Sequence, residues 1–103
     1  MFKATVFYPY VKDAKFDIDY YCKKHMPMVQ QKLGPACKSI GVDFGIGGGG
    51  PNTPPSYIAI GYILTDNLEK FQAAVAQHDA AFRADLPNYT TIPPIIQISE
   101  VKL

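Results

Sequence analysis

The sequence predicts a single α+β domain in which two helices cover one face of an antiparallel sheet. Four segments alternate between apolar and other residues, as β-strands do. Two longer segments carry apolar residues at three- and four-residue spacing, as amphipathic helices do. These segments follow one another in the order βαββαβ, and the 103 residues of the chain suffice for one domain, residues 1–103.

The four predicted strands are separated by turn-forming residues. They cover Phe2–Tyr8, Cys37–Gly45, Ser56–Thr65 and Ile95–Leu103. Pro9 ends the first strand, and Pro93-Pro94 precede the last one. The second and third strands are joined by the glycine- and proline-rich segment Gly47–Pro55, which favours an antiparallel pair and which we expect to be the most mobile part of the chain.

The first predicted helix begins at Asp17, whose side chain can cap it, and ends at Gly34-Pro35. Its apolar stripe consists of Ile18, Tyr21, Cys22, His25, Val29 and Leu33. Pro27 interrupts the stripe, because proline lacks a backbone N–H and disfavours helical dihedral angles at the preceding residue. We therefore expect a kink or break at His25-Met26.

The second predicted helix is capped by Asp66 or Asn67 and closes at Pro87-Asn88. Its stripe consists of Leu68, Phe71, Val75, His78, Phe82 and Leu86. With both helices placed, the order βαββαβ is that of a ferredoxin-like fold.

The two faces of the predicted sheet differ in character. The bulkier one, which we expect beneath the helices, carries Ile40, Val42, Phe44, Ile58, Ile60 and Tyr62. The other carries Thr5, Phe7, Ser39, Gly41, Asp43, Tyr57, Ala59 and Gly61. A small, mixed face of this kind is poorly suited to bulk water, so we expect two copies to meet there as a homodimer that leaves cavities between the sheets.

Composition excludes several classes of protein. Apolar residues make up 48% of the chain and charged residues 18%, which is typical of a globular protein rather than a disordered one. The net charge of +1 disfavours nucleic acid as a partner. The longest apolar runs, such as Tyr57–Leu64, are too short to span a membrane. No signal peptide is visible, so we expect a cytoplasmic protein without a membrane partner.

The two cysteines, Cys22 and Cys37, lack the spacing of a metal site. We expect both to be buried or half-buried thiols, and a reducing compartment disfavours a disulfide between them. Gly47–Gly50 is followed by neither Lys-Ser/Thr nor a helix, so it does not fit a phosphate-binding loop. We therefore predict no metal and no cofactor.

Two stretches of the chain resemble the EthD family, the ethyl tert-butyl ether degradation proteins and their relatives. The first comprises Tyr8-Pro9 and Phe16-Asp-Ile-Asp-Tyr-Tyr-Cys-Lys-Lys-His-Met-Pro27. The second comprises Phe82-Arg-Ala-Asp-Leu-Pro-Asn-Tyr-Thr-Thr-Ile-Pro93 and Ile98-Ser-Glu-Val101. Together they run from the first strand to the last. The resemblance implies a dimeric α+β barrel of two ferredoxin-like subunits, each with a small-molecule pocket, but it does not fix a reaction.

His25 is the first candidate for chemistry, because an imidazole can act as general acid or base near neutral pH. It lies at the expected helix break and matches the histidine of the EthD motif. Burial lowers the pKa of an imidazole and a nearby carboxylate raises it, so the direction of the shift stays open here. The alternative is a structural histidine that bonds a carbonyl freed by Pro27.

Four further residues are candidates for substrate binding. Tyr21 lies four residues before His25 and shares its helical face, and Tyr8 and Tyr20 flank the same region. Asp43 would be a candidate base if its sheet face lines a cavity, and Tyr57 shares that face. We assign Tyr8, Tyr21, Asp43 and Tyr57 to the candidate site, although packing and solvent exposure are the simpler uses of these residue types.

His78 and Asp79 are adjacent on the second helix and point about 100° apart, so they do not form a dyad. We expect His78 to be a packing residue. The sequence and the resemblance thus predict a homodimer of a degradation or secondary-metabolic pathway. We expect it to bind a small apolar or aromatic oxygenated molecule and to act on it without a cofactor, with His25 as acid–base residue. The alternative is a non-catalytic accessory or carrier protein that supports an oxygenase.

Overall fold

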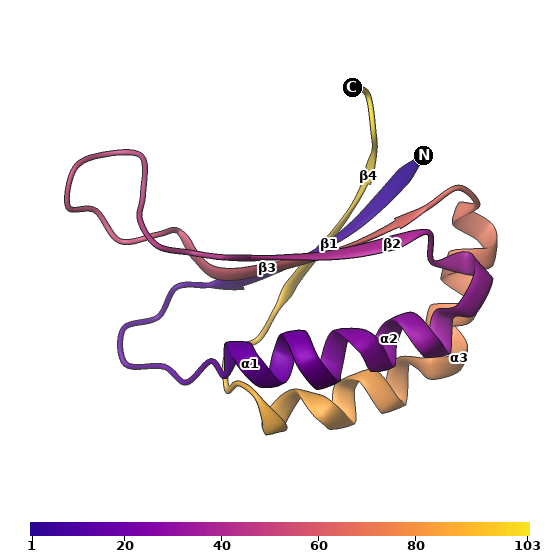
Figure 1. Cartoon of the computed structure of the whole chain (residues 1–103), viewed down its shortest axis with the longest axis horizontal. Helices are drawn as coiled ribbons and strands as arrows, with labels where there is room; N and C mark the ends of the chain where they lie inside the picture. The colour runs from indigo at the N-terminus through magenta and orange to yellow at the C-terminus, as the bar shows by residue number, and fades with distance from the viewer.

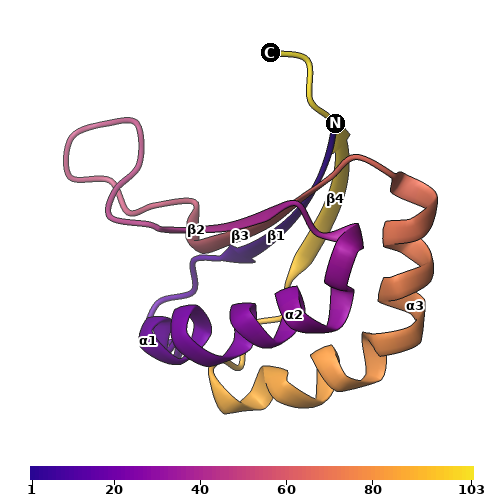
Figure 2. The same cartoon turned by 45° about the vertical axis from the view of Figure 1, so that its right-hand side comes forward.

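The computed structural model describes all 103 residues and has the predicted βαββαβ order. Its elements are β1 (Phe2–Pro9), α1 (Ile18–Tyr20), α2 (Met26–Leu33), β2 (Ser39–Phe44), β3 (Tyr57–Thr65), α3 (Leu68–Asp85) and β4 (Ile95–Glu100). Figure 1 and Figure 2 show the helices together on one side of the curved sheet, with the other side uncovered. The predicted α+β class is therefore confirmed.

The sheet has the strand order β2-β3-β1-β4, and its pairs are all antiparallel. The two terminal strands lie side by side, since β1 pairs with β4 along its length. At the middle of β1, Val6 is opposite Gly61 on one side and Ile96 on the other. This is the ferredoxin-like topology expected from the order of elements.

The first helical region is continuous rather than broken (Figure 1). Asp17 caps it, as predicted, by accepting a hydrogen bond from the backbone N–H of Tyr20 at 3.1 Å. The segment Tyr21–His25 is a π-helix, and the N–H of Met26 donates to the carbonyl of Tyr21. The expected break at His25-Met26 is thus wrong in form, because a wide π turn accommodates Pro27 while the backbone stays helical. Such π segments are frequent at functional sites.

The assignment of the faces of β3 is wrong. Its buried residues are the smaller set that alternates with the predicted one, namely Ala59, Gly61, Ile63 and Thr65. A Cβ atom added to Gly61 would overlap the hydroxyl of Tyr21, which shows that this face lies beneath the first helical region. The space above the small residues is filled by large side chains from outside the sheet.

The bulky residues of β3 instead lie on the uncovered side, which we call the open face. They are Ile60, Tyr62 and Leu64, and the register places Lys3, Thr5 and Phe7 of β1 beside them. For β2 the prediction is confirmed, since Ile40, Val42 and Phe44 are opposite Ile63, Gly61 and Ala59 on the helix-covered face.

Helix α3 begins after Asn67, whose side chain accepts from the N–H of Lys70 at 3.0 Å. Both cysteines are free: Cys37 is half-buried, as expected, but Cys22 is exposed. The expectation for Cys22 is wrong because Cys22 follows the buried Tyr21, and consecutive side chains of a helix point about 100° apart. The side chain of Cys22 therefore points away from the sheet and into solvent.

The connection between β2 and β3 extends away from the body of the molecule (Figure 1). It is exposed over nearly its whole length and has two internal hydrogen bonds between Thr53 and Gly50 and one from Gly48 to Thr53. Its mobility stays a prediction. The helices include none with the length and apolar character needed to cross a membrane.

Candidate functional site

A cavity of about 1040 Å³ lies between the helix-covered face of the sheet and helices α2 and α3. It is lined by 25 residues, of which 16 are hydrophobic. Small residues of β1, Ala4 and Val6, contribute to the sheet side, and Phe71, Val75 and Phe82 contribute from α3. The cavity has the size and the apolar lining of a small-molecule site.

The cavity opens toward the edge strand β4. Ile96 and Ile98 belong to its lining and are nevertheless 62% and 42% exposed. At the rim of the cavity, Arg83 donates to the carboxylate of Asp79 at 2.6 Å. The polar groups of the interior gather elsewhere, at the end where the π segment meets the chain after α3.

His25 is the central residue of that polar end. It is 6% exposed, and its Nδ1 lies 2.8 Å from Oδ2 of Asp85. Its ring stacks on Tyr21 at 5.5 Å between centroids and lies 4.6 Å from the ring of Tyr89. The predicted pairing of His25 with Tyr21 on one helical face is thus confirmed.

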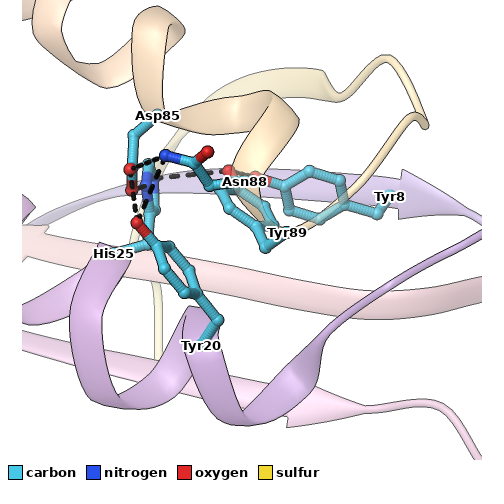
Figure 3. A network of polar contacts seen from close by, with 6 residues as sticks. All are labelled: Tyr8, Tyr20, His25, Asp85, Asn88 and Tyr89. Carbon is cyan, nitrogen blue, oxygen red and sulfur yellow. Dashed lines mark hydrogen bonds and ion pairs between the residues drawn. The ribbon is translucent and has the colours of Figure 1, made fainter.

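Asp85, the last residue of α3, is held by three donors (Figure 3). Besides His25, the hydroxyl of Tyr20 donates to Oδ1 at 2.6 Å and the amide of Asn88 donates to it at 3.0 Å. Partial burial raises the pKa of the Asp85 carboxyl, but these hydrogen bonds outweigh it and hold the pKa below its ordinary value. Asp85 is therefore ionised at neutral pH.

The ionised Asp85 determines the tautomer of His25. A carboxylate can only accept, so Nδ1 carries the proton and Nε2 has a free lone pair. Burial lowers the pKa of His25, although the hydrogen bond and charge of Asp85 oppose the shift. His25 is thus a neutral imidazole at pH 7, and Nε2 faces the hydroxyl of Tyr89 at 3.4 Å.

Three fully buried tyrosines, Tyr8, Tyr21 and Tyr89, lie at this end of the cavity. The hydroxyls of Tyr8 and Tyr89 are 2.8 Å apart, and the rings of Tyr8 and Tyr21 meet edge to face at 5.4 Å. Burial raises the pKa of all three phenols. They therefore keep their protons at physiological pH, and the hydroxyl of Tyr89 is an O–H donor next to the imidazole.

The structure brings together some of the predicted site residues and separates others. Tyr8, Tyr21 and His25 meet at the polar end of the cavity. Asp43 is exposed at the edge of the open face, where it is opposite Ile60. Tyr57 packs against Phe7 at 5.0 Å, also away from the cavity.

Sequence reasoning did not single out Asp85, Asn88 and Tyr89 as site residues. All three belong to the second stretch that resembles the EthD family, and that was the available signal. Local spacing could not reveal them, since 60 residues separate Asp85 from His25. His78 packs near Phe82 with ring centroids 6.3 Å apart and is not part of the cavity lining.

No group of three or more His, Cys, Asp or Glu side chains is placed to hold a metal ion. The polar end of the cavity brings two kinds of group together. These are a neutral imidazole fixed by a carboxylate, and phenol donors in an apolar cavity. Such a set can accept a proton, stabilise the resulting imidazolium and donate to an oxygen of a bound molecule.

Comparison with known proteins identifies the class to which this fold and site belong. Residues 11–92 match the EthD domain, so the chain is a member of the EthD family. An EthD-like protein from Ralstonia eutropha JMP134 is 43% identical, with a TM-score of 0.97 over 99% of this chain and 92% of that one.

A second solved structure shares the fold at greater distance. It is an ethyl tert-butyl ether degradation (EthD) family protein from Bacillus halodurans C-125, with 19% identity and a TM-score of 0.73. The match covers 99% of each chain. No functionally curated protein matches this chain.

Proposed function

We propose that this EthD-family protein binds a small apolar or aromatic oxygenated molecule in the cavity and acts on it without a cofactor, with His25 as acid–base residue. The observation that carries the proposal is the His25–Asp85 pair, with Nδ1 and Oδ2 2.8 Å apart, in the wall of an apolar cavity. A neutral imidazole with a free Nε2 is a base at neutral pH. The ionised partner favours the imidazolium that forms when the base takes a proton.

A non-catalytic role, as an accessory or carrier protein that supports an oxygenase, is the second candidate. It is favoured by the apolar lining, 16 of 25 residues, and by the lack of an activated nucleophile among the groups of the site. In that role the His25–Asp85 bond only fixes the end of α3 against the first helical region. Ligand binding is common to both candidates, and dependence of a reaction on His25 separates them.

We also propose that the protein acts as a homodimer joined through the open face. Ile60, Tyr62 and Phe7 give this face a half-buried apolar surface, larger than the mixed one expected from the sequence. Burial of such a surface is the main driving force for association. Light scattering at micromolar concentration should give the mass of two chains, and a stable monomer would contradict the proposal.

Binding in the cavity can be tested by replacing each of two alanines of α3 with phenylalanine. Ala76 lines the cavity and Ala73 does not, although both are exposed on the same helix. We expect Ala76→Phe to weaken calorimetric binding of 2-naphthol by at least about tenfold, because the new ring occupies ligand volume. Ala73→Phe should leave binding unchanged. Equal binding by both variants would contradict a site in this cavity.

The catalytic candidate is tested by His25→Ala. An acid–base role predicts that activity falls by about 10²–10⁴-fold while 2-naphthol still binds. A carrier role predicts that the same change lowers the melting temperature and leaves no reaction to lose. The two results are distinguishable because the binding assay reports on the cavity independently of turnover.

A further inference from the structure

The hydroxyl of Tyr89 is shared between two neighbours (Figure 3). It lies 2.8 Å from the hydroxyl of Tyr8 and 3.4 Å from Nε2 of His25. Because the Nδ1 proton of His25 is directed at Asp85, Nε2 can only accept. Tyr89 is therefore the donor to His25, and its oxygen accepts from Tyr8.

The bond from Tyr89 to His25 is the weakest link of this chain of contacts. Its 3.4 Å exceeds the usual range for a hydrogen bond from a hydroxyl, whereas the Tyr8–Tyr89 and His25–Asp85 bonds are both 2.8 Å. The proton of Tyr89 is thus the one most easily directed at another acceptor. A ligand oxygen that accepts it leaves the lone pair of Nε2 free to act as a base.

The spacing of donor and base fits a carbonyl group with hydrogen on the neighbouring carbon, and an apolar cavity favours a ketone among such groups. In a ketone with hydrogen on the neighbouring carbon, the carbonyl oxygen and the acidic C–H are two bonds apart. A donor and a base 3.4 Å apart can contact both at once. Most of the remaining lining is apolar, with Val29, Met26 and Leu33 contributed by α2, so the rest of the molecule should be mainly apolar too.

On the basis of the acid–base role proposed above, we infer that the ligand is an apolar enolisable ketone and that Tyr89 is a second catalytic residue, which donates to the carbonyl oxygen while His25 removes the neighbouring proton. The protein would then be an isomerase that moves a proton from one carbon of its substrate to another.

The reaction balances with the groups that are present. Nε2 takes the proton from the carbon next to the carbonyl, and the C–H electron pair becomes the C=C bond of an enolate. The C=O pair moves to the oxygen, where the hydroxyl of Tyr89 stabilises the negative charge. The imidazolium, paired with Asp85, then gives a proton back to the same carbon or to a conjugated one, and in D₂O exchange of its Nε2 proton with solvent makes the returned proton a deuteron. No oxidant or other reactant is consumed.

The experiment measures α-proton exchange of 1-tetralone and 2-tetralone in D₂O by NMR, with the full-length protein. We expect catalysed exchange above the buffer rate, a loss of about 10²–10³-fold for Tyr89→Phe, and a loss of about 10²–10⁴-fold for His25→Ala. Tyr8→Phe tests a positioning role and should lose less than Tyr89→Phe, since the hydroxyl of Tyr8 bonds to the donor and not to the carbonyl oxygen. Tyr10→Phe, an exposed tyrosine outside the lining, should exchange as the unchanged protein does.

The pH dependence of exchange by the unchanged protein is a test that does not depend on whether the variants fold. Exchange should rise with pH through the deprotonation of His25, whose titratable neighbours are Asp85, Tyr8, Tyr21 and Tyr89. Exchange that needs His25 but not Tyr89 would overturn this inference and leave the proposed acid–base function intact. Binding of the ketones without exchange would overturn both. No exchange and no binding of either ketone, while 2-naphthol binds, would overturn the ketone class alone.

Discussion

The two faces of the sheet are built from the same strands but differ in the size of their side chains and in what covers them. On the helix-covered face, β3 presents Ala59 and Gly61, and the ring of Tyr21 takes the volume above Gly61. On the open face the same strand presents Ile60 and Tyr62. The small residues therefore mark the side where large aromatic groups from the helices approach, and the bulky residues mark the side left for other contacts.

The carboxylates of Asp43 and Asp85 lie on opposite sides of the sheet and have different surroundings. Asp43 on the open face is exposed, and it makes no hydrogen bond with another side chain. Asp85 on the covered side receives hydrogen bonds from His25, Tyr20 and Asn88. Only the second carboxylate is in a position to orient a base. The following substitutions compare one face with the other.

The largest difference is expected between Asp85→Asn and Asp43→Asn. The first removes the charge that fixes the Nδ1 proton and stabilises the imidazolium of His25, so exchange of the tetralones should fall by about 10²–10⁴-fold. The second changes a side chain outside the cavity and should leave exchange within about twofold. A comparable loss from Asp43→Asn would show that the open face contributes to the site.

A smaller difference is expected between Gly61→Ala and Gly41→Ala. The added methyl of Gly61→Ala overlaps the buried hydroxyl of Tyr21, so we expect the free energy of unfolding in urea to fall by about 1–3 kcal/mol. At Gly41 the methyl meets only the ring of Tyr62, which is half-buried on the open face and can turn away, so the loss should stay below about 1 kcal/mol.

A double variant checks the cause of the loss at Gly61. Adding Tyr21→Phe removes the overlapping hydroxyl, so Gly61→Ala should cost less in that background than in the unchanged protein. The ring carbon Cζ stays 3.0 Å from the added methyl, which is why the rescue should be partial. Equal costs in the two backgrounds would mean that Tyr21 does not set the limit.

The smallest effect is the pH dependence of stability. Burial lowers the pKa of His25 in the folded state, so the unfolded chain binds a proton first as the pH falls below 6.5. The free energy of unfolding should therefore decrease from pH 6.5 downward, by at most about 1.4 kcal/mol per pH unit from this group. Melting temperatures at pH 7.5 and 5.5 should differ less for His25→Gln. An unchanged difference would assign the pH dependence elsewhere.

The pH window of Asp85 is separate from that of His25. Its hydrogen bonds hold its pKa below 3.8 in the folded state, so its stabilising effect is present above that value and is lost as the pH falls through the lowered pKa. Loss of stability near pH 6 thus reports on His25 and loss below pH 4 reports in part on Asp85. The two can be separated in one titration.

Much of the fold was predictable because local sequence patterns determine where its helices and strands begin and end. The caps at Asp17 and Asn67 and the end of the first helix at Gly34 each follow from the preferences of single residues. The face of β3 was not predictable by bulk, because which alternate set is covered depends on what the helices bring to it. In this case they bring Tyr21, which requires glycine at position 61.

The candidate site was predictable in part for the same reason. His25, Tyr21 and Tyr8 lie in or next to one helix, and their spacing placed two of them on one face. Asp85 and Tyr89 reach His25 only through the packing of α3 against the first helical region, across 60 and 64 residues of sequence. No spacing rule connects residues at that separation.

The most direct test of the central claim is the ¹⁵N NMR titration of the His25 imidazole. The account predicts that at pH 7 the ring is neutral with its proton on Nδ1, and that its pKa lies below 6.5. Asp85→Asn should move that pKa further down, because the carboxylate opposes the effect of burial. A proton on Nε2 at pH 7, or titration at or above pH 6.5, would contradict a free base facing the cavity.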